Sequence, residues 1–208
     1  MAFEETTLSR LARGRVRTLT GSEQLLLRDH LLRLDPDSRR DRFNGILCDA
    51  FIERYAAACA VDGTLIVCYV VDGVVRGAAE LHPPGIFDEL PEVAFSVEAS
   101  LRRKGIGTQL FRRLIAEARL KGYWKLRIIT SGNNHAMRGL ATKFGARLDI
   151  RRGESIGTLD LVEVPPRSWS KFQRLLVHGA SATAIGADAE ELWAASGFPA
   201  RFAVSARN

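Results

Sequence analysis

The segment Arg102-Arg103-Lys104-Gly105-Ile106-Gly107 has the residue types of a phosphate-binding turn. Its two glycines lie where an apolar run ends and an amphipathic pattern begins. Glycines at such a junction let successive backbone N–H groups point toward one site, and the positive end of the helix dipole adds to the attraction. We therefore expect the amides of Arg103 to Thr108 to hold a phosphorylated ligand.

Two familiar glycine-rich motifs do not fit this turn. A Walker loop needs Gly-x-x-x-x-Gly-Lys-Ser/Thr, which the sequence lacks. A dinucleotide-binding fingerprint needs a third glycine at position 110, which is Leu110. It also needs an acidic residue after the following strand, where the sequence reads Ile129-Thr130-Ser131-Gly132-Asn133. The turn therefore belongs to another class of phosphate site.

The elements around the turn predict a mixed α/β sheet. The β-rich runs 65–71 and 74–81 flank Asp72-Gly73, a strong hairpin signal. A strand at 93–97 leads into the turn, and helical periodicity then continues to Gly122. After these come a strand at 126–130, a helix from Asn133-Asn134 to Gly145, and a strand pair at 146–150 and 155–164. This order places a βαβ unit in the sheet, and the turn opens the helix of that unit.

The remainder of the chain is assigned to an edge strand, three helical stretches and a tail. Arg15 to Leu19 alternates as a strand does, and Thr20 to Glu23 fits a capping box before a leucine-rich helix. Further helical stretches follow Pro36 and cover 47–60. We interpret 1–164 as one domain and 165–208 as a C-terminal helical extension. The apolar residues of the extension suit packing on the domain or on a partner subunit, as in a homodimer, and the sequence does not choose between these.

Composition limits the class of protein. The 208 residues are 46% hydrophobic and 26% charged, as in one globular domain. No apolar run approaches the roughly 20 residues of a membrane helix, and the N-terminus lacks the apolar stretch of a signal peptide, so we expect a cytoplasmic protein. The net charge of +6 suits an acidic partner, but the basic residues are dispersed among acids, which makes nucleic acid an unlikely partner.

The cysteines and histidines predict no metal site, because neither set has the spacing of metal ligands. We expect the three cysteines to be reduced and buried: Cys48, Cys59 and Cys68.

Three elements within 64–148 resemble, in order, the Gcn5-related N-acetyltransferase (GNAT) superfamily. That family has a pyrophosphate loop Arg/Gln-x-x-Gly-x-Gly/Ala, a strand before it, and a later helix beginning Asn-x-x-(Ala/Met) and ending Lys-x-Gly. The matching positions are Arg102, Gly105 and Gly107 in the loop, 92–97 in the strand, and Asn134, Met137, Lys143 and Gly145 in the helix. The strand and the Ser-Arg…Arg-Phe pattern within 34–43 look most like bacterial protein-lysine acetyltransferase domains. The resemblance implies a central mixed sheet with a parallel strand pair that splays apart and helices on both faces.

The resemblance also implies acetyl-CoA as co-substrate. The turn would hold the pyrophosphate, and the pantetheine arm would lie along the strand before it. Asn134 would contact the cofactor from the other side or, in the alternative reading, only cap its helix. The implied cofactor-binding residues are Phe95, Ser96, Val97, Arg102, Arg103, Lys104, Gly105, Ile106, Gly107, Thr108 and Asn134.

Acetyl transfer to an amine requires that the ammonium lose a proton and that the departing thiolate be stabilised. By resemblance, Glu92 is the candidate base, and the alternative is that it merely ends a strand at the surface. Glu80 is the reserve candidate. Many family members place a tyrosine acid seven residues after the asparagine, but here that position is Ala141, so this acid is absent.

We therefore expect an acetyl-CoA-dependent N-acetyltransferase that acts by direct attack in a ternary complex. Its acceptor is a primary amine, either a protein lysine or a small molecule. The alternative is a sensor or assembly module that binds CoA without catalysis.

Overall fold

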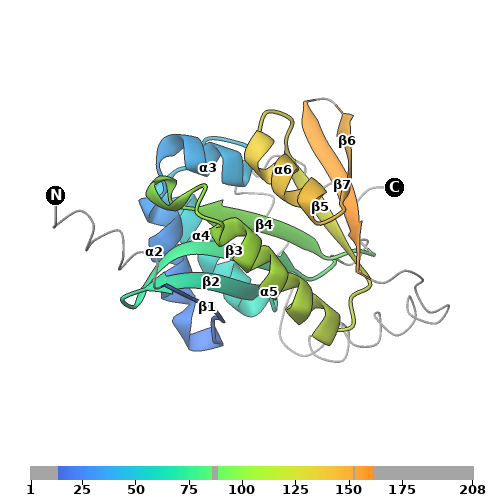
Figure 1. Ribbon diagram of the computed structural model, residues 1–208. Helices are drawn as coiled ribbons and strands as arrows, with labels where there is room; N and C mark the ends of the chain where they lie inside the picture. Colours follow the sequence, from blue (N-terminus) through green and yellow to red (C-terminus); the bar gives the residue numbers. More distant parts are fainter. Residues whose placement is uncertain (1–13, 86–88, 152, 162–208) are drawn as a thin grey trace, which may run out of the picture.

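The computed structural model describes residues 14–85, 89–151 and 153–161. Within these ranges the strands form one seven-stranded sheet in the order β1-β2-β3-β4-β5-β7-β6 (Figure 1). Neighbouring strands are antiparallel except β4 and β5, which run parallel. The strands are β1 Arg15–Thr18, β2 Leu65–Val71, β3 Val74–His82, β4 Glu92–Val97, β5 Lys125–Ser131, β6 Arg147–Arg151 and β7 Glu154–Asp160.

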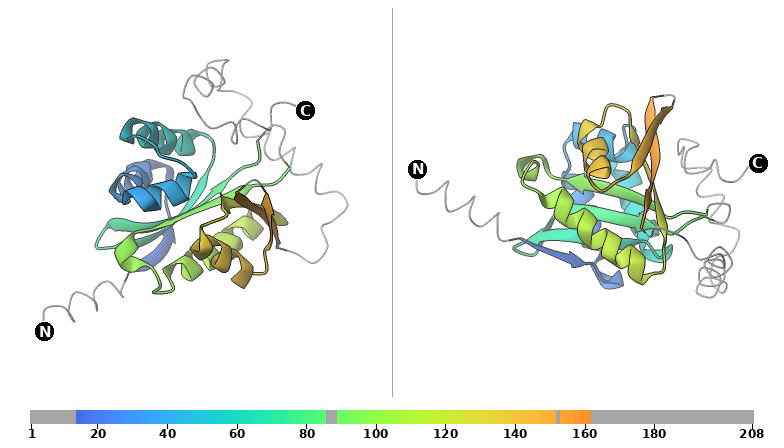
Figure 2. Two further views of the ribbon diagram at one scale, coloured as in Figure 1. Left: turned by 90° about the horizontal axis from the view of Figure 1, so that it is seen from above. Right: turned by 45° about the vertical axis from the view of Figure 1, so that its right-hand side comes forward.

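Helices cover both faces of the sheet, as Figure 2 shows from above. On one face lie η1 Gly21–Glu23, α2 Gln24–Arg33, α3 Pro36–Phe43 and α4 Asp49–Val61. On the other lie α5 Ile106–Leu120 and α6 His135–Lys143, with the short helix η2 Ala99–Leu101 between β4 and α5. The predicted mixed α/β fold with two helical layers is confirmed.

Each face of the sheet has its own core. Along β2, Val67 and Tyr69 pack with the α5 side, whereas Ile66 and Cys68 pack with the α2 and α4 side. Successive side chains of a strand point to opposite faces, so a strand that is apolar at every position needs cover on both sides. The central strands are therefore clamped between two layers, which fixes the position of β4.

Local signals in the sequence place most of the turns correctly. Asp72 and Gly73 both have left-handed φ angles, 49° and 78°, as a two-residue hairpin between β2 and β3 requires. The capping box is also present, because the Thr20 N–H donates to the Glu23 carboxylate over 2.9 Å. The residues it caps begin as the short helix η1 before α2 continues.

Some predictions need correction or fall outside the described residues. Cys59 and Cys68 are buried, but Cys48 is exposed at the N-cap of α4, so the prediction of three buried cysteines is wrong for Cys48. The final strand ends at Asp160 rather than at 164. The helices predicted in 165–208 lie outside the described ranges. No helix in the described part of the chain has the length and apolar character to cross a membrane.

The parallel strands β4 and β5 pair only near the start of β4. Their paired positions, within the described residues, are Glu92 with Arg127 and Val93 with Ile128. The Arg127 N–H also donates to the Pro91 carbonyl over 2.8 Å. Beyond these positions β4 runs on to Val97 without pairing to β5, so the predicted splayed parallel pair is confirmed.

Candidate active site

The turn between β4 and α5 presents a series of unpaired backbone amides. Arg103 and Gly105 both have left-handed φ angles, 61° and 78°, and Gly105 is the N-cap of α5. The helical hydrogen bonds of α5 begin at Gln109, whose backbone N–H donates to the Gly105 carbonyl over 3.1 Å. The six preceding amides, of 103–108, donate to no backbone acceptor in the described residues. Such amides at a helix N-terminus suit an anion.

The three basic side chains of the turn do not act together. Arg103 and Lys104 are exposed. The Arg102 side chain instead turns back, where its Nε donates to the Val97 carbonyl over 3.1 Å and its Nη2 donates to the Ser38 hydroxyl. Ser38 in turn bonds to Asp35, the N-cap of α3. Arg102 therefore ties the turn to α3, and the other two cations remain available to a ligand.

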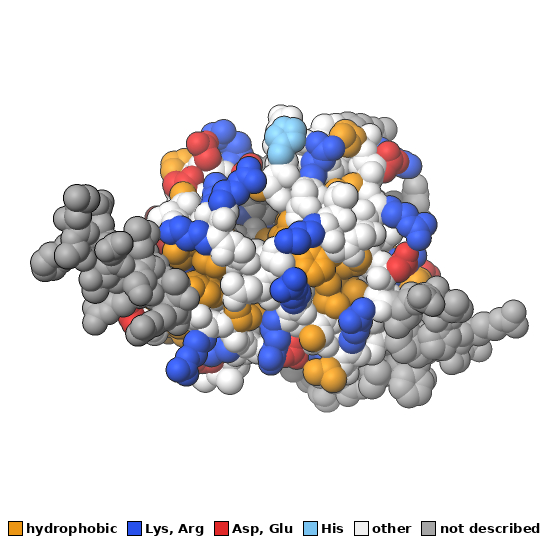
Figure 3. All heavy atoms as spheres, in the orientation of Figure 1, with side chains coloured by type: hydrophobic (Ala, Val, Ile, Leu, Met, Phe, Trp, Pro, Cys, Tyr) orange, Lys and Arg blue, Asp and Glu red, His pale blue; other side chains and the backbone are white. Residues whose placement is uncertain are grey.

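The start of α5 lies against α6. A Cβ added at Gly107 would lie 3.4 Å from Leu140 Cδ2, which is contact distance. The Lys143 ammonium donates to the Thr108 hydroxyl over 3.4 Å, and Ile106 is buried. Figure 3 shows Lys and Arg side chains spread over this face with apolar patches between them. On the face drawn in Figure 3 the basic residues are thus dispersed.

The backbone of β4 faces two different neighbours in alternation. The Pro91 carbonyl faces β5, and the Glu98 N–H faces β3, where it donates to the Arg76 carbonyl over 3.1 Å. The main-chain N–H and C=O groups of successive residues in a strand point to opposite neighbours. The main-chain groups of Phe95 and Val97 therefore face the side on which β5 no longer pairs with β4. Those of Ser96 face β3. Two of the three strand residues predicted to bind the cofactor therefore face the open edge.

Ser96 supports the strand from the helical layer instead. Its hydroxyl lies 2.9 Å from Nε2 of the fully buried His30 on α2. His30 Nδ1 lies 3.6 Å from the Glu98 carboxylate, which also pairs with Arg33 and Arg76. Burial alone would raise the pKa of Glu98, but these partners outweigh it and lower the pKa to about 2. This cluster anchors the C-terminal end of β4.

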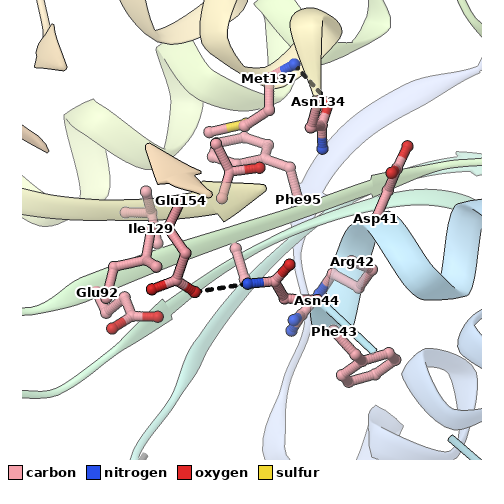
Figure 4. Close-up of a pocket in the computed structure, with 13 residues that line it drawn as sticks. Asp41, Arg42, Phe43, Asn44, Glu92, Phe95, Ile129, Asn134, Met137 and Glu154 are labelled. Carbon is pink, nitrogen blue, oxygen red and sulfur yellow. Dashed lines mark hydrogen bonds between the residues drawn. The ribbon is translucent and has the colours of Figure 1, made fainter. Parts of the chain in front are cut away.

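A pocket lies where β4 and β5 part. It is bounded by the end of α3, the start of α6 and the start of β7, and Figure 3 shows the surface hollowed between α3 and α6. Figure 4 draws the lining residues, which are Asp41, Arg42, Phe43, Asn44, Glu92, Val93, Ala94, Phe95, Ile129, Thr130, Asn134, Met137 and Glu154. The structure thus brings together three predicted site residues from two elements, Glu92 and Phe95 of β4 and Asn134 at the start of α6.

Asn134 both caps α6 and lines the pocket. Its Oδ1 accepts from the Met137 N–H over 3.0 Å, which is the capping bond drawn in Figure 4. The amide nitrogen is turned away from the helix. The two readings of Asn134 are therefore compatible, since the oxygen serves the helix and the nitrogen is left for a ligand.

Glu92 is half-buried in the pocket at the first position of β4. Two further carboxylates line the same pocket, those of Asp41 and Glu154. The phosphate-binding turn follows the other end of β4, and a six-residue strand spans about 20 Å. A carboxylate that can accept a proton and a turn that can bind an anion thus lie at opposite ends of one strand, as an extended two-ended ligand requires.

Glu80, the reserve candidate for the base, lies outside the pocket lining. Its fully buried carboxylate accepts from Arg42 Nη2 over 2.7 Å and from the Tyr55 hydroxyl over 2.5 Å. Burial would raise the pKa of Glu80, but the Arg42 charge and the contacts with His82 and Tyr55 lower it to about 2. An ionised carboxylate sealed behind Arg42 is a poor proton acceptor for a group in the pocket.

The residues on α6 supply no evident acid. Ala141 is fully buried in the core between α6 and the sheet, and His135 is exposed at the first position of α6 and does not line the pocket. Within the described residues, no three His, Cys, Asp or Glu side chains are grouped to hold a metal ion.

The wall of the pocket that α3 and β7 provide was not predicted from the sequence. Asp41 and Arg42 come from the segment 34–43, whose Ser-Arg…Arg-Phe pattern was the available signal, and Asn44 directly follows that segment. Glu154 has no local signal, because it is brought to the pocket only by the pairing of β7 with β5.

Comparison with known proteins agrees with this geometry. The model of a family described as the Acetyltransferase (GNAT) family matches residues 27–146. The fold is similar to the GNAT domain of S. lividans PAT, with a TM-score of 0.60 and 19% identity over 71% of this chain and 90% of that one. It is also similar to yncA from Salmonella typhimurium, solved with its cofactor acetyl-CoA (TM-score 0.55, 19% identity, 74% and 98% coverage). A third similar structure is the paia N-acetyltransferase from Thermoplasma acidophilum in complex with coenzyme A (TM-score 0.52, 16% identity, 71% and 98% coverage).

Proposed function

Because the chain belongs to the GNAT acetyltransferase family, we propose that it transfers the acetyl group of acetyl-CoA to a primary amine. The observation that carries this proposal is the arrangement along β4. Six unpaired amides follow one end of the strand, and a pocket lined by carboxylates lies at the other end. Between them lies the edge of β4 that no longer pairs with β5.

The cofactor occupies this arrangement along its length. The amides of 103–108 bind the pyrophosphate, and the exposed Arg103 and Lys104 add positive charge. The pantetheine amides bond to the outward main-chain groups of Phe95 and Val97, as an added strand would. The similar structures from Salmonella typhimurium and Thermoplasma acidophilum, which hold acetyl-CoA and coenzyme A, support the choice of this cofactor.

The cofactor contacts of the remaining predicted residues follow from their positions. The Asn134 amide nitrogen approaches the arm from the opposite side of the pocket. Arg102 and Ser96 hold the strand and the turn in place through Val97 and His30 rather than by facing the cofactor.

Glu92 is the proposed base. An acceptor amine arrives as an ammonium ion, which has no lone pair, so a carboxylate must first take a proton directly or through a water. The neutral amine then attacks the thioester carbonyl carbon, a C–N bond forms, and the C–S bond breaks to release the CoA thiolate. The extra proton on the amide nitrogen passes to water or to the thiolate. Both substrates are bound together, because the pocket adjoins the strand edge that holds the arm.

The acceptor is a cationic primary amine, either a protein lysine side chain or a small molecule. Asp41, Glu92 and Glu154 give the pocket wall an acidic character that attracts a positively charged group.

The test is an acceptor screen. The purified chain is given acetyl-CoA and a panel of polyamines, amino acids and lysine peptides, and free thiol and acetylated product are both measured. Stoichiometric CoA release and amine acetylation on at least one acceptor supports the proposal, and cofactor binding without turnover on any amine contradicts it.

A CoA-binding sensor is the second candidate function. The observation that favours it is the alanine at position 141, where many family members place the acid. A sensor would bind acetyl-CoA and CoA in the same cleft and would leave the thioester intact with every amine in the panel.

A further inference from the structure

Arg42 is a buried cation in the wall of the pocket. Its side chain is 3% exposed, and it pairs with the fully buried Glu80. Its Nε donates to Glu80 over 3.3 Å, and its Nη2 donates to Glu80 and to the Tyr55 hydroxyl. Its third nitrogen, Nη1, has no hydrogen-bond partner among the described residues. The Nε and Nη2 edge of the guanidinium therefore bonds to the protein. Nη1 can still donate to a ligand in the pocket that Arg42 lines.

The surroundings of Arg42 hold its guanidinium in one orientation. The group lies over the rings of Phe43 and Tyr55, 4.7 Å and 5.2 Å from their centroids. Behind it, His82 Nε2 lies 3.0 Å from the Tyr55 hydroxyl and 3.5 Å from the Glu80 carboxylate. The charge of Glu80 raises the pKa of Arg42 despite its burial, so the guanidinium stays protonated. A cation fixed in this way needs no reorganisation when negative charge develops beside it.

The reaction needs such a cation at this place. The acetyl-transfer step forms negative charge first on the thioester oxygen and then on the departing sulfur. Ala141 is sealed in the core and supplies no acid. The charged residues that line the pocket, within the described ranges, are the carboxylates of Asp41, Glu92 and Glu154 and the guanidinium of Arg42. Arg42 is thus the one cation among these lining residues.

Arg42 also lies beside the strand position at which the thioester would bind. Its partner Glu80 is the residue on β3 that pairs with Ala94 of β4, and Ala94 and Phe95 line the pocket together with Arg42. Strand β4 separates from β5 after Val93, immediately before Ala94 and Phe95.

We propose that Arg42 is a catalytic residue, which hydrogen-bonds through Nη1 to the reacting thioester and stabilises the charge that passes from its oxygen to its sulfur. This inference rests on the proposed function. The amine lone pair forms the C–N bond while the carbonyl π pair moves to oxygen. The oxygen pair then re-forms the carbonyl bond as the C–S bond breaks, and the two electrons of the C–S bond leave with the sulfur. The ammonium ion gives its first proton to the Glu92 carboxylate, the proton still on nitrogen after attack passes to water or to the departing thiolate, and Arg42 gives up no proton.

The test separates this role from simple neutralisation of Glu80. Arg42→Lys keeps a positive charge beside Glu80 but removes the planar group that carries Nη1. Arg40→Lys, on the exposed side of the same helix, is the matched control. We expect Arg42→Lys to lower kcat by about 100-fold, the effect of losing one donor to a developing anion, while the variant stays folded at the assay temperature and its acetyl-CoA dissociation constant stays near that of the unaltered chain.

A second variant guards against misfolding. Arg42→Gln combined with Glu80→Gln removes both buried charges together, and we expect it to fold and to lose at least as much kcat. A folded Arg42→Lys or double variant with unaltered kcat overturns the role of Arg42. Absence of turnover in the unaltered chain, with acetyl-CoA bound, overturns the proposed function instead, so the two failures are distinct.

Discussion

Asn44 and Glu154 are joined across one end of the pocket by a hydrogen bond of 2.6 Å, from Asn44 Nδ2 to Glu154 Oε1 (Figure 4). The two residues are 110 positions apart in the chain. Asn44 ends α3 in the left-handed region, with φ 54°, and Glu154 begins β7. This bond therefore connects the helical wall of the pocket to the far part of the sheet.

Asn44→Gly should loosen the acceptor side of the pocket without straining the backbone, because glycine accepts a positive φ. The loss of a hydrogen bond to a carboxylate is expected to cost about 1–3 kcal/mol of stability. We expect a higher KM for the amine and an unchanged dissociation constant for CoA. Steady-state kinetics and calorimetry check these values, and an effect confined to CoA affinity would refute this role.

Glu92→Gln should lower kcat by at least about 100-fold, because an amide does not accept the proton of the ammonium ion. Acetyl-CoA affinity should stay nearly unchanged, since the turn that holds the pyrophosphate lies at the other end of β4. Glu89→Gln, an exposed neighbour, is the control. Equal losses of turnover and of cofactor affinity would assign Glu92 a structural role.

Gly107→Glu should abolish CoA binding while the fold survives. The new carboxylate would place negative charge at the amides that bind the pyrophosphate, whereas the nearest atom to its Cβ is Leu140 Cδ2 at 3.4 Å. Gly139→Glu makes the same change on the adjacent helix, at an exposed position with no atom near its Cβ. Calorimetric titration with CoA should show heat for the control alone. Binding by both variants would place the pyrophosphate elsewhere.

The buried pair of Arg42 and Glu80 should make the fold sensitive to acid. The pKa of Glu80 falls from 4.5 to about 2 on folding, so the unfolded chain binds more protons in this window. The stabilisation from Glu80 is therefore complete above the unfolded pKa and is lost as the pH falls toward 2.

Tyr55→Phe should shift acid unfolding to higher pH. It removes the hydroxyl that donates to Glu80, so the ionised form of Glu80 is less stable in the folded protein. We expect a loss of about 1–3 kcal/mol in the free energy of unfolding. Tyr123→Phe, a buried tyrosine packed on the α5 side of the sheet, is the control. Circular dichroism between about pH 2 and pH 5 follows the transition. Identical acid unfolding of Tyr55→Phe and the unaltered chain would contradict the assigned network.

The elements that local chemistry determines were predictable from the sequence. Asp72-Gly73 adopts the positive φ angles that its hairpin needs, and Gly105 does so at the start of α5, so the turns follow from short-range sterics. Strand and helix periodicities located the βαβ unit, and the GNAT resemblance supplied the parting of β4 from β5.

The parts of the site that depend on long-range pairing were not predictable. Arg40 and Arg42 look alike in an arginine-rich helix, yet Arg40 is exposed and Arg42 is buried against Glu80, 38 positions away. Only the packing of α3 on the sheet decides which arginine turns inward. Likewise, the main-chain groups of Ser96 face β3 because of the register between β3 and β4, which no local sequence pattern reveals.

A crystal structure of this chain with CoA would show where the cofactor binds. We predict that the diphosphate accepts hydrogen bonds from the amides of 103–108 and that the arm runs along Phe95 and Val97. The thiol should then lie in the pocket beside Arg42 and Glu92. A diphosphate bound away from this turn, or a thiol outside the pocket, would contradict the account.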